Sequence, residues 1–149
     1  MNQLLENLSD AEILSLTLIG EARGEPIEGI IAVGCIIRNR MHHSPSKYHT
    51  YKDVCYEPKQ FSCWNENDTN YPFLIDLASQ LIAGQKLNDP YIRQCMWVAN
   101  GIIDWSLIDN TSGSLYYLTN ELFKSNLKPK WSLGAKNIKD IGRQTFFNV

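Results

Sequence analysis

Glu21 is the residue in this sequence best placed to donate a proton to a substrate. It ends a strongly patterned helical segment and precedes a glycine-rich break. The last turn of a helix presents unpaired carbonyl groups and the negative end of the helix dipole, which disfavour a charged carboxylate. Burial beside apolar side chains would also raise the pKa of this carboxyl group. A carboxylic acid that stays protonated near neutral pH suits general acid cleavage of a glycosidic bond. An ordinary exposed glutamate is the alternative.

The charged neighbours of Glu21 leave this interpretation open. Arg23 can pair with Glu25 or Glu28, and it would lower the pKa of Glu21 if it came close. The alternative is that Arg23 and Glu25 are charged side chains in a loop, exposed to solvent.

Other catalytic chemistries find little support in the sequence. The three histidines share one loop and no HExxH or GxSxG pattern occurs, so we expect no metal site, no cofactor and no serine nucleophile. The cysteines at positions 35, 55, 63 and 95 form no CxxC pair. They are expected to be free, buried thiols, with a disulfide pair or a nucleophilic cysteine as the alternatives.

Aromatic residues outside the expected helices indicate a sugar-binding groove. Sugar rings have apolar faces and hydroxyl edges, so their sites combine aromatic platforms with polar side chains. Packing in the core is the alternative for each aromatic residue taken singly. The aromatic candidates, which lie near Gln60, Ser62, Asn65 and Asn120, are Phe61, Trp64, Tyr116, Tyr117 and Trp131.

Helices and short strands must position these side chains. Ser9 and Glu12 form a capping-box pattern that predicts the start of the helix ending near Glu21. Gly and Pro signals mark several of the other boundaries. Further helices are predicted at about 26–40, 52–56, 73–83 and 90–107, and strands at 114–118 and 144–147. Helices followed by a small strand-bearing tail predict the α+β class.

Composition restricts the class of protein. The 149 residues are 44% hydrophobic with a net charge of -2, which predicts one folded domain over residues 1–149 without a nucleic-acid partner. No apolar run approaches the length of a membrane span, so we expect no stable membrane insertion. The N-terminus lacks a signal-peptide pattern, which predicts synthesis in a cytoplasm.

Several motifs, in order over about residues 10–148, resemble the SleB-type cell-wall hydrolases, which include spore-cortex-lytic enzymes and phage relatives. The matching segments are Ile19-Gly20-Glu21-Ala22-Arg23-Gly24-Glu25-Pro26, Tyr56-Glu57-Pro58-Lys59-Gln60-Phe61-Ser62, Gly113-Ser114-Leu115-Tyr116-Tyr117 and Ile141-Gly142-Arg143-Gln144-Thr145-Phe146-Phe147. The resemblance implies a lysozyme-like, mainly helical fold with a small sheet near the C-terminus. It also implies cleavage of peptidoglycan glycan strands, as a lytic transglycosylase, with Glu21 as the catalytic acid and base.

The resemblance also directs the expected substrate contacts. We expect a monomer with an open groove, since the substrate is a polymer. Many relatives carry histidines where this chain has Tyr116, Leu118 and Gln144. If those histidines have a function in the relatives, this chain performs it with other residues or lacks it. The residues expected to contact the substrate are Glu25, Gln60, Phe61, Ser62, Tyr116 and Tyr117.

Alternatives to a transglycosylase remain open. A hydrolytic muramidase or glucosaminidase needs a second carboxylate about 5–9.5 Å from the acid, and Glu25, Glu57 and Glu121 are candidates. A catalytically inactive wall-binding module is the alternative outside the enzymes. The sequence favours a phage endolysin that is made in the host cytoplasm and reaches the wall through a membrane lesion.

Overall fold

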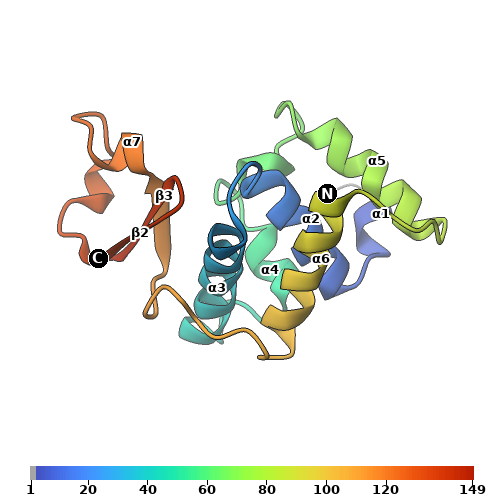
Figure 1. The fold of residues 1–149 in the computed structure, drawn as a ribbon, viewed down its shortest axis with the longest axis horizontal. Helices are drawn as coiled ribbons and strands as arrows, with labels where there is room; N and C mark the ends of the chain where they lie inside the picture. The colour runs from blue at the N-terminus through green and yellow to red at the C-terminus, as the bar shows by residue number, and fades with distance from the viewer. Residues whose placement is uncertain (1–2) are drawn as a thin grey trace.

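The computed structural model describes residues 3–149 and sets a group of helices beside a small antiparallel sheet (Figure 1). The helices are α1 (Gln3–Glu6), α2 (Asp10–Glu21), α3 (Ile27–His43), α4 (Tyr51–Cys55), α5 (Tyr71–Ile82), α6 (Pro90–Ile103) and α7 (Asn120–Phe123). The strands are β1 (Tyr116–Thr119), β2 (Lys136–Ile141) and β3 (Gln144–Asn148), and two short 3-10 helices are η1 (Ser62–Trp64) and η2 (Lys130–Ser132). The predicted α+β class, mainly helical with a small C-terminal sheet, is confirmed.

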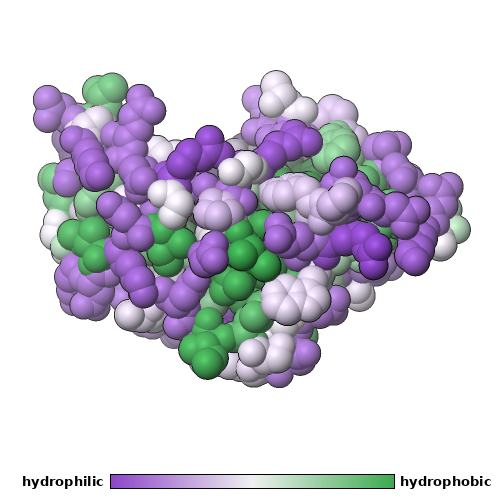
Figure 2. All heavy atoms as spheres, viewed as in Figure 1, coloured by the Kyte–Doolittle hydropathy of each residue, from purple (hydrophilic) through white to green (hydrophobic). Residues whose placement is uncertain are grey.

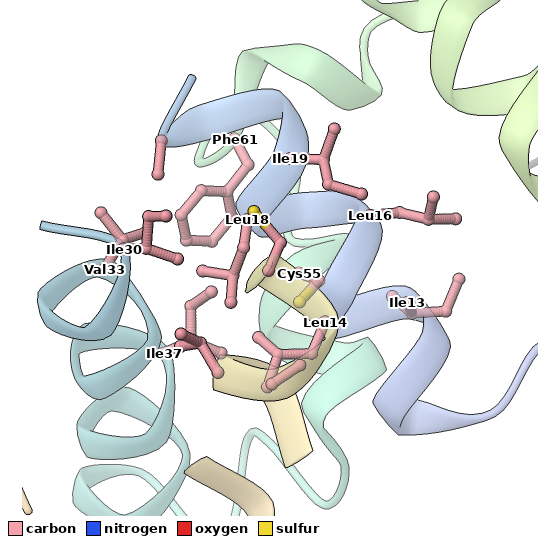
Figure 3. Close-up of a cluster of buried hydrophobic side chains, with 14 of the residues drawn as sticks. Ile13, Leu14, Leu16, Leu18, Ile19, Ile30, Val33, Ile37, Cys55 and Phe61 are labelled. Carbon is pink, nitrogen blue, oxygen red and sulfur yellow. The ribbon is translucent and has the colours of Figure 1, made fainter. Parts of the chain in front are cut away.

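Helix α2 lies at the centre of the helical part and ends at Glu21. The Ser9 hydroxyl accepts from the Glu12 amide at 3.1 Å and the Glu12 carboxylate accepts from the Ser9 amide at 2.9 Å, which confirms the predicted capping box. The helix packs against α3, α4, α5 and α6. Leu14 and Leu18 lie on the side of α2 that faces α3, near Cys55 and Phe61, whereas Ile13, Leu16 and Ile19 project from its opposite side (Figure 3). A helix that is apolar on all sides lies in the core of the protein. The elements packed around α2 therefore fix the position of its last residue, Glu21.

Helix α3 extends further than the sequence predicts. Pro26 is its N-cap rather than its first helical residue, and the helix continues to His43. Ser44 precedes Pro45, which disfavours helical backbone at Ser44, so the helix ends there. The extension adds Met41, His42 and His43 to the helix.

Five elements in the described chain are not predicted from the sequence (α1, α7, β2 and the 3-10 helices η1 and η2), and one predicted helix is too long. Helix α6 ends at Ile103 rather than near 107, with Asp104 as its C-cap. Helices α1 and α7 have only four residues each, too short to show a periodic pattern. Strand β2 is almost fully exposed, so it lacks the alternation that marks a half-buried strand.

The sheet has the strand order β1-β3-β2 with antiparallel neighbours. Gly142 and Arg143 form the turn between β2 and β3, and Gly142 has a φ of 58° that favours glycine. A Cβ atom there would lie 3.1 Å from Glu25 Oε2. The turn therefore docks closely against the start of α3.

All four cysteines are buried without disulfide bonds, in line with the expectation of packed thiols. No helix among residues 3–149 is both long enough and apolar enough to cross a membrane.

Candidate active site

A groove between the helices and the sheet contains Glu21. Its volume is about 680 Å³, and Figure 2 shows a hollow in the outline of the molecule between these two parts with a largely hydrophilic rim. Helix α2 contributes Gly20 and Glu21, and α3 contributes Arg40. The remaining lining residues are Lys59, Gln60, Ser62, Tyr116, Tyr117, Leu118, Thr119, Leu122, Trp131 and Gln144.

Two donors hold the carboxyl group of Glu21. The Cys63 amide donates to Oε2 at 3.3 Å, and the Tyr117 hydroxyl donates to Oε1 at 3.3 Å. Gly20 permits the first contact, because a Cβ atom at that position would lie 2.6 Å from the Cβ atom of Cys63. The glycine before Glu21 thus allows η1 to approach the end of α2.

The electrostatic environment favours the protonated form of Glu21. Burial raises the pKa of Glu21, hydrogen bonds from Cys63 and Tyr117 lower it in part, and the charge of Asp68 raises it. Burial and the neighbouring Glu21 raise the pKa of Tyr117 well above its ordinary value, so its hydroxyl stays protonated and remains a donor. The raised pKa inferred from the sequence is confirmed in direction. The group therefore keeps its proton to higher pH than a free carboxyl group does, and two donors can stabilise it after the proton is lost.

The sheet separates the aromatic residues onto two faces. Tyr117 pairs with Phe146 in register, with ring centroids 5.6 Å apart, and this side faces the helices. Tyr116 pairs with Phe147 and packs against Trp131, whose ring centroid lies 5.4 Å from that of Tyr116. Trp131 is 51% exposed, so its ring is available to stack on a sugar at the groove.

Four of the six expected substrate contacts line the groove and two do not. Gln60, Ser62, Tyr116 and Tyr117 lie with Glu21 as expected. Phe61 is buried in the core, and the guanidinium of Arg40 covers its ring at 5.4 Å from the centroid. The groove side of this segment is instead formed by its polar neighbours.

Glu25 is the second residue that does not line the groove. Its carboxylate accepts from the Arg143 amide at 3.2 Å and forms an ion pair with Arg143 Nε at 3.5 Å. Arg23, the partner considered from the sequence, donates instead to Asn70 at 3.0 Å. The ion pair holds the β2–β3 turn against α3, so Glu25 has a structural position next to the site.

Glu21 supplies the one carboxylate that lines the groove within residues 3–149. Glu57 forms an ion pair with Lys47 at 2.9 Å, and Glu121 lines a neighbouring cavity with Glu25. Asp68, which the sequence analysis did not consider, acts on the pKa of Glu21 but does not line the groove. The arrangement favours chemistry with a single carboxyl group.

Arg40 is the main groove residue that the sequence analysis missed. Its Nε donates to the Leu115 carbonyl at 2.7 Å and its Nη1 to Gln60 at 3.1 Å, so it joins α3, β1 and the segment before η1. Because basic residues are common in the last turns of helices, the position of Arg40 in α3 did not indicate that it lines the groove. Thr119 and Leu122 were missed because they lie around α7, which was not predicted.

The alternatives of metal and thiol chemistry gain no support. Among residues 3–149, no group of three or more His, Cys, Asp or Glu side chains could hold a metal ion. Burial and the nearby Glu21 raise the pKa of Cys63, which disfavours the thiolate that a nucleophile requires.

Comparisons with known proteins agree with the motif resemblance. A family model described as "Cell Wall Hydrolase" matches residues 24–147. Spore cortex-lytic enzymes of Bacillus subtilis (strain 168) and Oceanobacillus iheyensis are each 28% identical over 138 residues, which is 93% of this chain. The chain spans 37% and 41% of these relatives, less than half of their length.

Solved structures match over nearly the whole chain. The catalytic domain of the Bacillus cereus SleB protein is 25% identical with a TM-score of 0.60, covering 99% of this chain and 98% of that one. The catalytic domain of the germination-specific lytic transglycosylase SleB from Bacillus anthracis is 24% identical with a TM-score of 0.58, covering 99% and 97%.

Proposed function

The chain belongs to the cell wall hydrolase family, and we propose that it cleaves peptidoglycan glycan strands as a lytic transglycosylase. The observation that carries this proposal is the carboxyl group of Glu21, whose pKa is raised by burial, in a groove that no second carboxylate lines among residues 3–149. The similarity to SleB catalytic domains over 97–98% of their length supports it as well.

In this mechanism Glu21 acts first as an acid and then as a base. It donates its proton to the bridging glycosidic oxygen as the bond to muramoyl C1 breaks. The resulting carboxylate removes the proton from the muramoyl C6 hydroxyl, whose oxygen bonds to C1 and closes a 1,6-anhydro ring. Glu21 ends protonated and no water is consumed. Because the nucleophile belongs to the substrate, one carboxyl group suffices.

The neighbours of Glu21 fit the charge changes in these steps. The Tyr117 hydroxyl and the Cys63 amide stabilise the carboxylate between the two proton transfers. Trp131 and Tyr116 offer an aromatic wall for the sugar faces, and Gln60 and Ser62 offer polar groups for its hydroxyls.

Mass spectrometry of the products from purified peptidoglycan tests the reaction. We expect muropeptides that end in anhydromuramic acid, about 18 Da lighter than hydrolytic products, because the bound C6 hydroxyl has an effective-molarity advantage over water. Reducing-end muramic acid would indicate a muramidase, and reducing-end glucosamine a glucosaminidase. Released peptides with intact glycan would contradict glycan cleavage, and no cleavage at all would favour the inactive wall-binding module.

Tyr117→Phe is expected to move the high-pH limb of the rate profile to higher pH. The hydroxyl stabilises the charged form of Glu21, so its removal raises the pKa of Glu21 further, and the acid stays protonated at higher pH. The rate at the optimum should fall about 10-fold, because a hydrogen bond to a charged group contributes about 1.5 kcal/mol. The measurement is the initial rate of wall solubilisation across pH.

The control for this variant is Tyr116→Phe, since within the described chain the tyrosine hydroxyl bonded to Glu21 belongs to Tyr117. It should leave the high-pH limb in place. An unchanged limb in Tyr117→Phe would show that the hydroxyl does not act on the catalytic acid.

The role of a phage endolysin stays a prediction of the sequence. It is tested by producing the protein inside a bacterial host with and without a membrane-lesion protein. Lysis that requires both proteins would support the role. If the cells do not lyse even when both proteins are present, the role is contradicted.

A further inference from the structure

Two further cavities adjoin the groove that holds Glu21, and Tyr116 lines all three. A cavity of about 240 Å³ shares Arg40, Gln60 and Tyr116 with the groove. A third cavity, of about 560 Å³, shares His43, Leu115 and Tyr116 with the second. The shared residues show that the three spaces adjoin one another, and we call the two cavities beyond the groove the cationic branch. Its basic lining residues are Arg40, His42, His43, Lys47 and Lys136.

The cationic branch is lined by basic residues, although the whole chain has a net charge of -2. Among residues 3–149, no Asp or Glu side chain lines the two cavities. Glu57 pairs with Lys47 at 2.9 Å from outside the lining, and the side chain of Lys47 remains 57% exposed. The C-terminal residue Val149 lines the far cavity beside Lys136. The side chains of the branch therefore favour an anionic occupant.

The dipole of α3 does not account for this set of charges. Arg40, His42 and His43 belong to its last turn, where basic residues are common. Lys47 and Lys136, however, come from the loop after α3 and from the start of β2. Three separate segments thus contribute basic residues to two adjoining cavities.

Arg40 connects the branch to the reacting site. Its hydrogen bonds to Leu115 and Gln60 fix the guanidinium between the groove and the first cavity. Tyr116 lines all three spaces. A substituent on a sugar held at Tyr116 would therefore lie next to the branch.

We propose that the cationic branch binds the carboxylates of the stem peptide on the muramoyl residue in the groove. This inference rests on the proposed function. The stem peptide is attached to the lactyl group of muramic acid and carries free carboxylates, so it is the anionic substituent nearest to the cleaved bond. Exposed basic side chains bind such groups weakly but selectively.

The test compares three substrates prepared from one peptidoglycan free of wall teichoic acid: intact, with its carboxylates amidated, and with its peptides removed by an amidase. The wild type should have the highest kcat/KM on the intact substrate. The double variant Lys47→Gln, Lys136→Gln should lose about 3- to 10-fold in kcat/KM on that substrate alone, since each exposed charge contact contributes modestly. The preference should also weaken at high salt.

The matched control is Lys86→Gln, Lys139→Gln, which removes the same charge from exposed positions that line neither the groove nor the branch. It should behave as the wild type. If the wild type forms anhydro products at equal rates from all three substrates, the proposal that the branch binds the stem peptide is overturned, but the proposed function is not. A preference that appears only when wall teichoic acid is retained would also overturn the proposal about the branch. Absence of anhydro products on every substrate would mean failure of the proposed function itself.

Discussion

The Glu21→Gln variant is expected to release anhydromuropeptides about 100 to 1,000 times more slowly than the wild type, the usual contribution of a positioned acid and base. The amide is nearly isosteric with the carboxyl group but cannot donate the proton that the leaving oxygen needs. Neither can it remove the C6 proton afterwards. The measurement is the initial rate of product formation by mass spectrometry at the optimal pH.

Stability separates a catalytic role of Glu21 from a structural one. Burial raises the pKa of Glu21 in the fold, so the native state favours its neutral form. The wild type therefore loses stability as the pH rises from the ordinary value of 4.5 through the raised pKa, and the Gln variant does not. Relative to the wild type, the free energy of unfolding of Glu21→Gln should therefore increase as the pH rises above 4.5, until the pH has passed the raised pKa of Glu21. The amide can accept from only one of the two donors, which opposes part of this gain.

Two further substitutions act as controls for the role of Glu21. Glu57→Gln and Glu121→Gln make the same chemical change at carboxylates outside the groove, and both should retain activity. A large loss in either would point to a hydrolase with a second carboxylate. Retained activity in Glu21→Gln would remove Glu21 from the mechanism, and an unfolded variant would make it structural.

Local signals explain why the helical framework of the site could be predicted from the sequence. The capping box of Ser9 and Glu12 and the apolar run after it place the end of α2 at Glu21. Helix physics therefore made Glu21 a candidate proton donor, with an ordinary exposed glutamate as the alternative, and the motif resemblance then favoured the catalytic role. The positions of Gln60, Ser62 and the two tyrosines in the groove followed from the motifs.

Pairings between distant segments explain what could not be predicted. Glu25 meets Arg143, which lies 118 residues away, and nothing near Glu25 signals that partner. Phe61 alternates with polar residues, but that pattern does not reveal which side faces the core. Strand β2 forms because the Gly142 turn pairs it with β3, although five of its six residues are exposed. Tertiary contacts override local pattern in each case.

The Phe146→Ala variant is expected to lose about 3–5 kcal/mol of unfolding free energy, the usual cost of removing a buried aromatic ring. Phe146 is fully buried and belongs to the core cluster that contains the apolar residues of α2 and α3. It is the β3 residue that attaches the sheet to the helices. Since globular domains are stable by about 5–15 kcal/mol, this loss is a large share of the total. Urea denaturation followed by circular dichroism measures it.

Phe146→Ala should also change the chemistry, because Phe146 supports the hydrogen bond between Tyr117 and Glu21. The ring of Tyr117 packs on that of Phe146, so without it the hydroxyl is no longer held at Oε1. The high-pH limb of the rate profile should then move to higher pH, as in Tyr117→Phe. Phe147→Ala is the matched control: Phe147 is equally buried but packs against Tyr116, Phe123 and Trp131. It should lower stability without moving the limb. A limb that moves equally in both variants would mean that general loosening of the sheet, rather than loss of support for Tyr117, changes the pKa of Glu21.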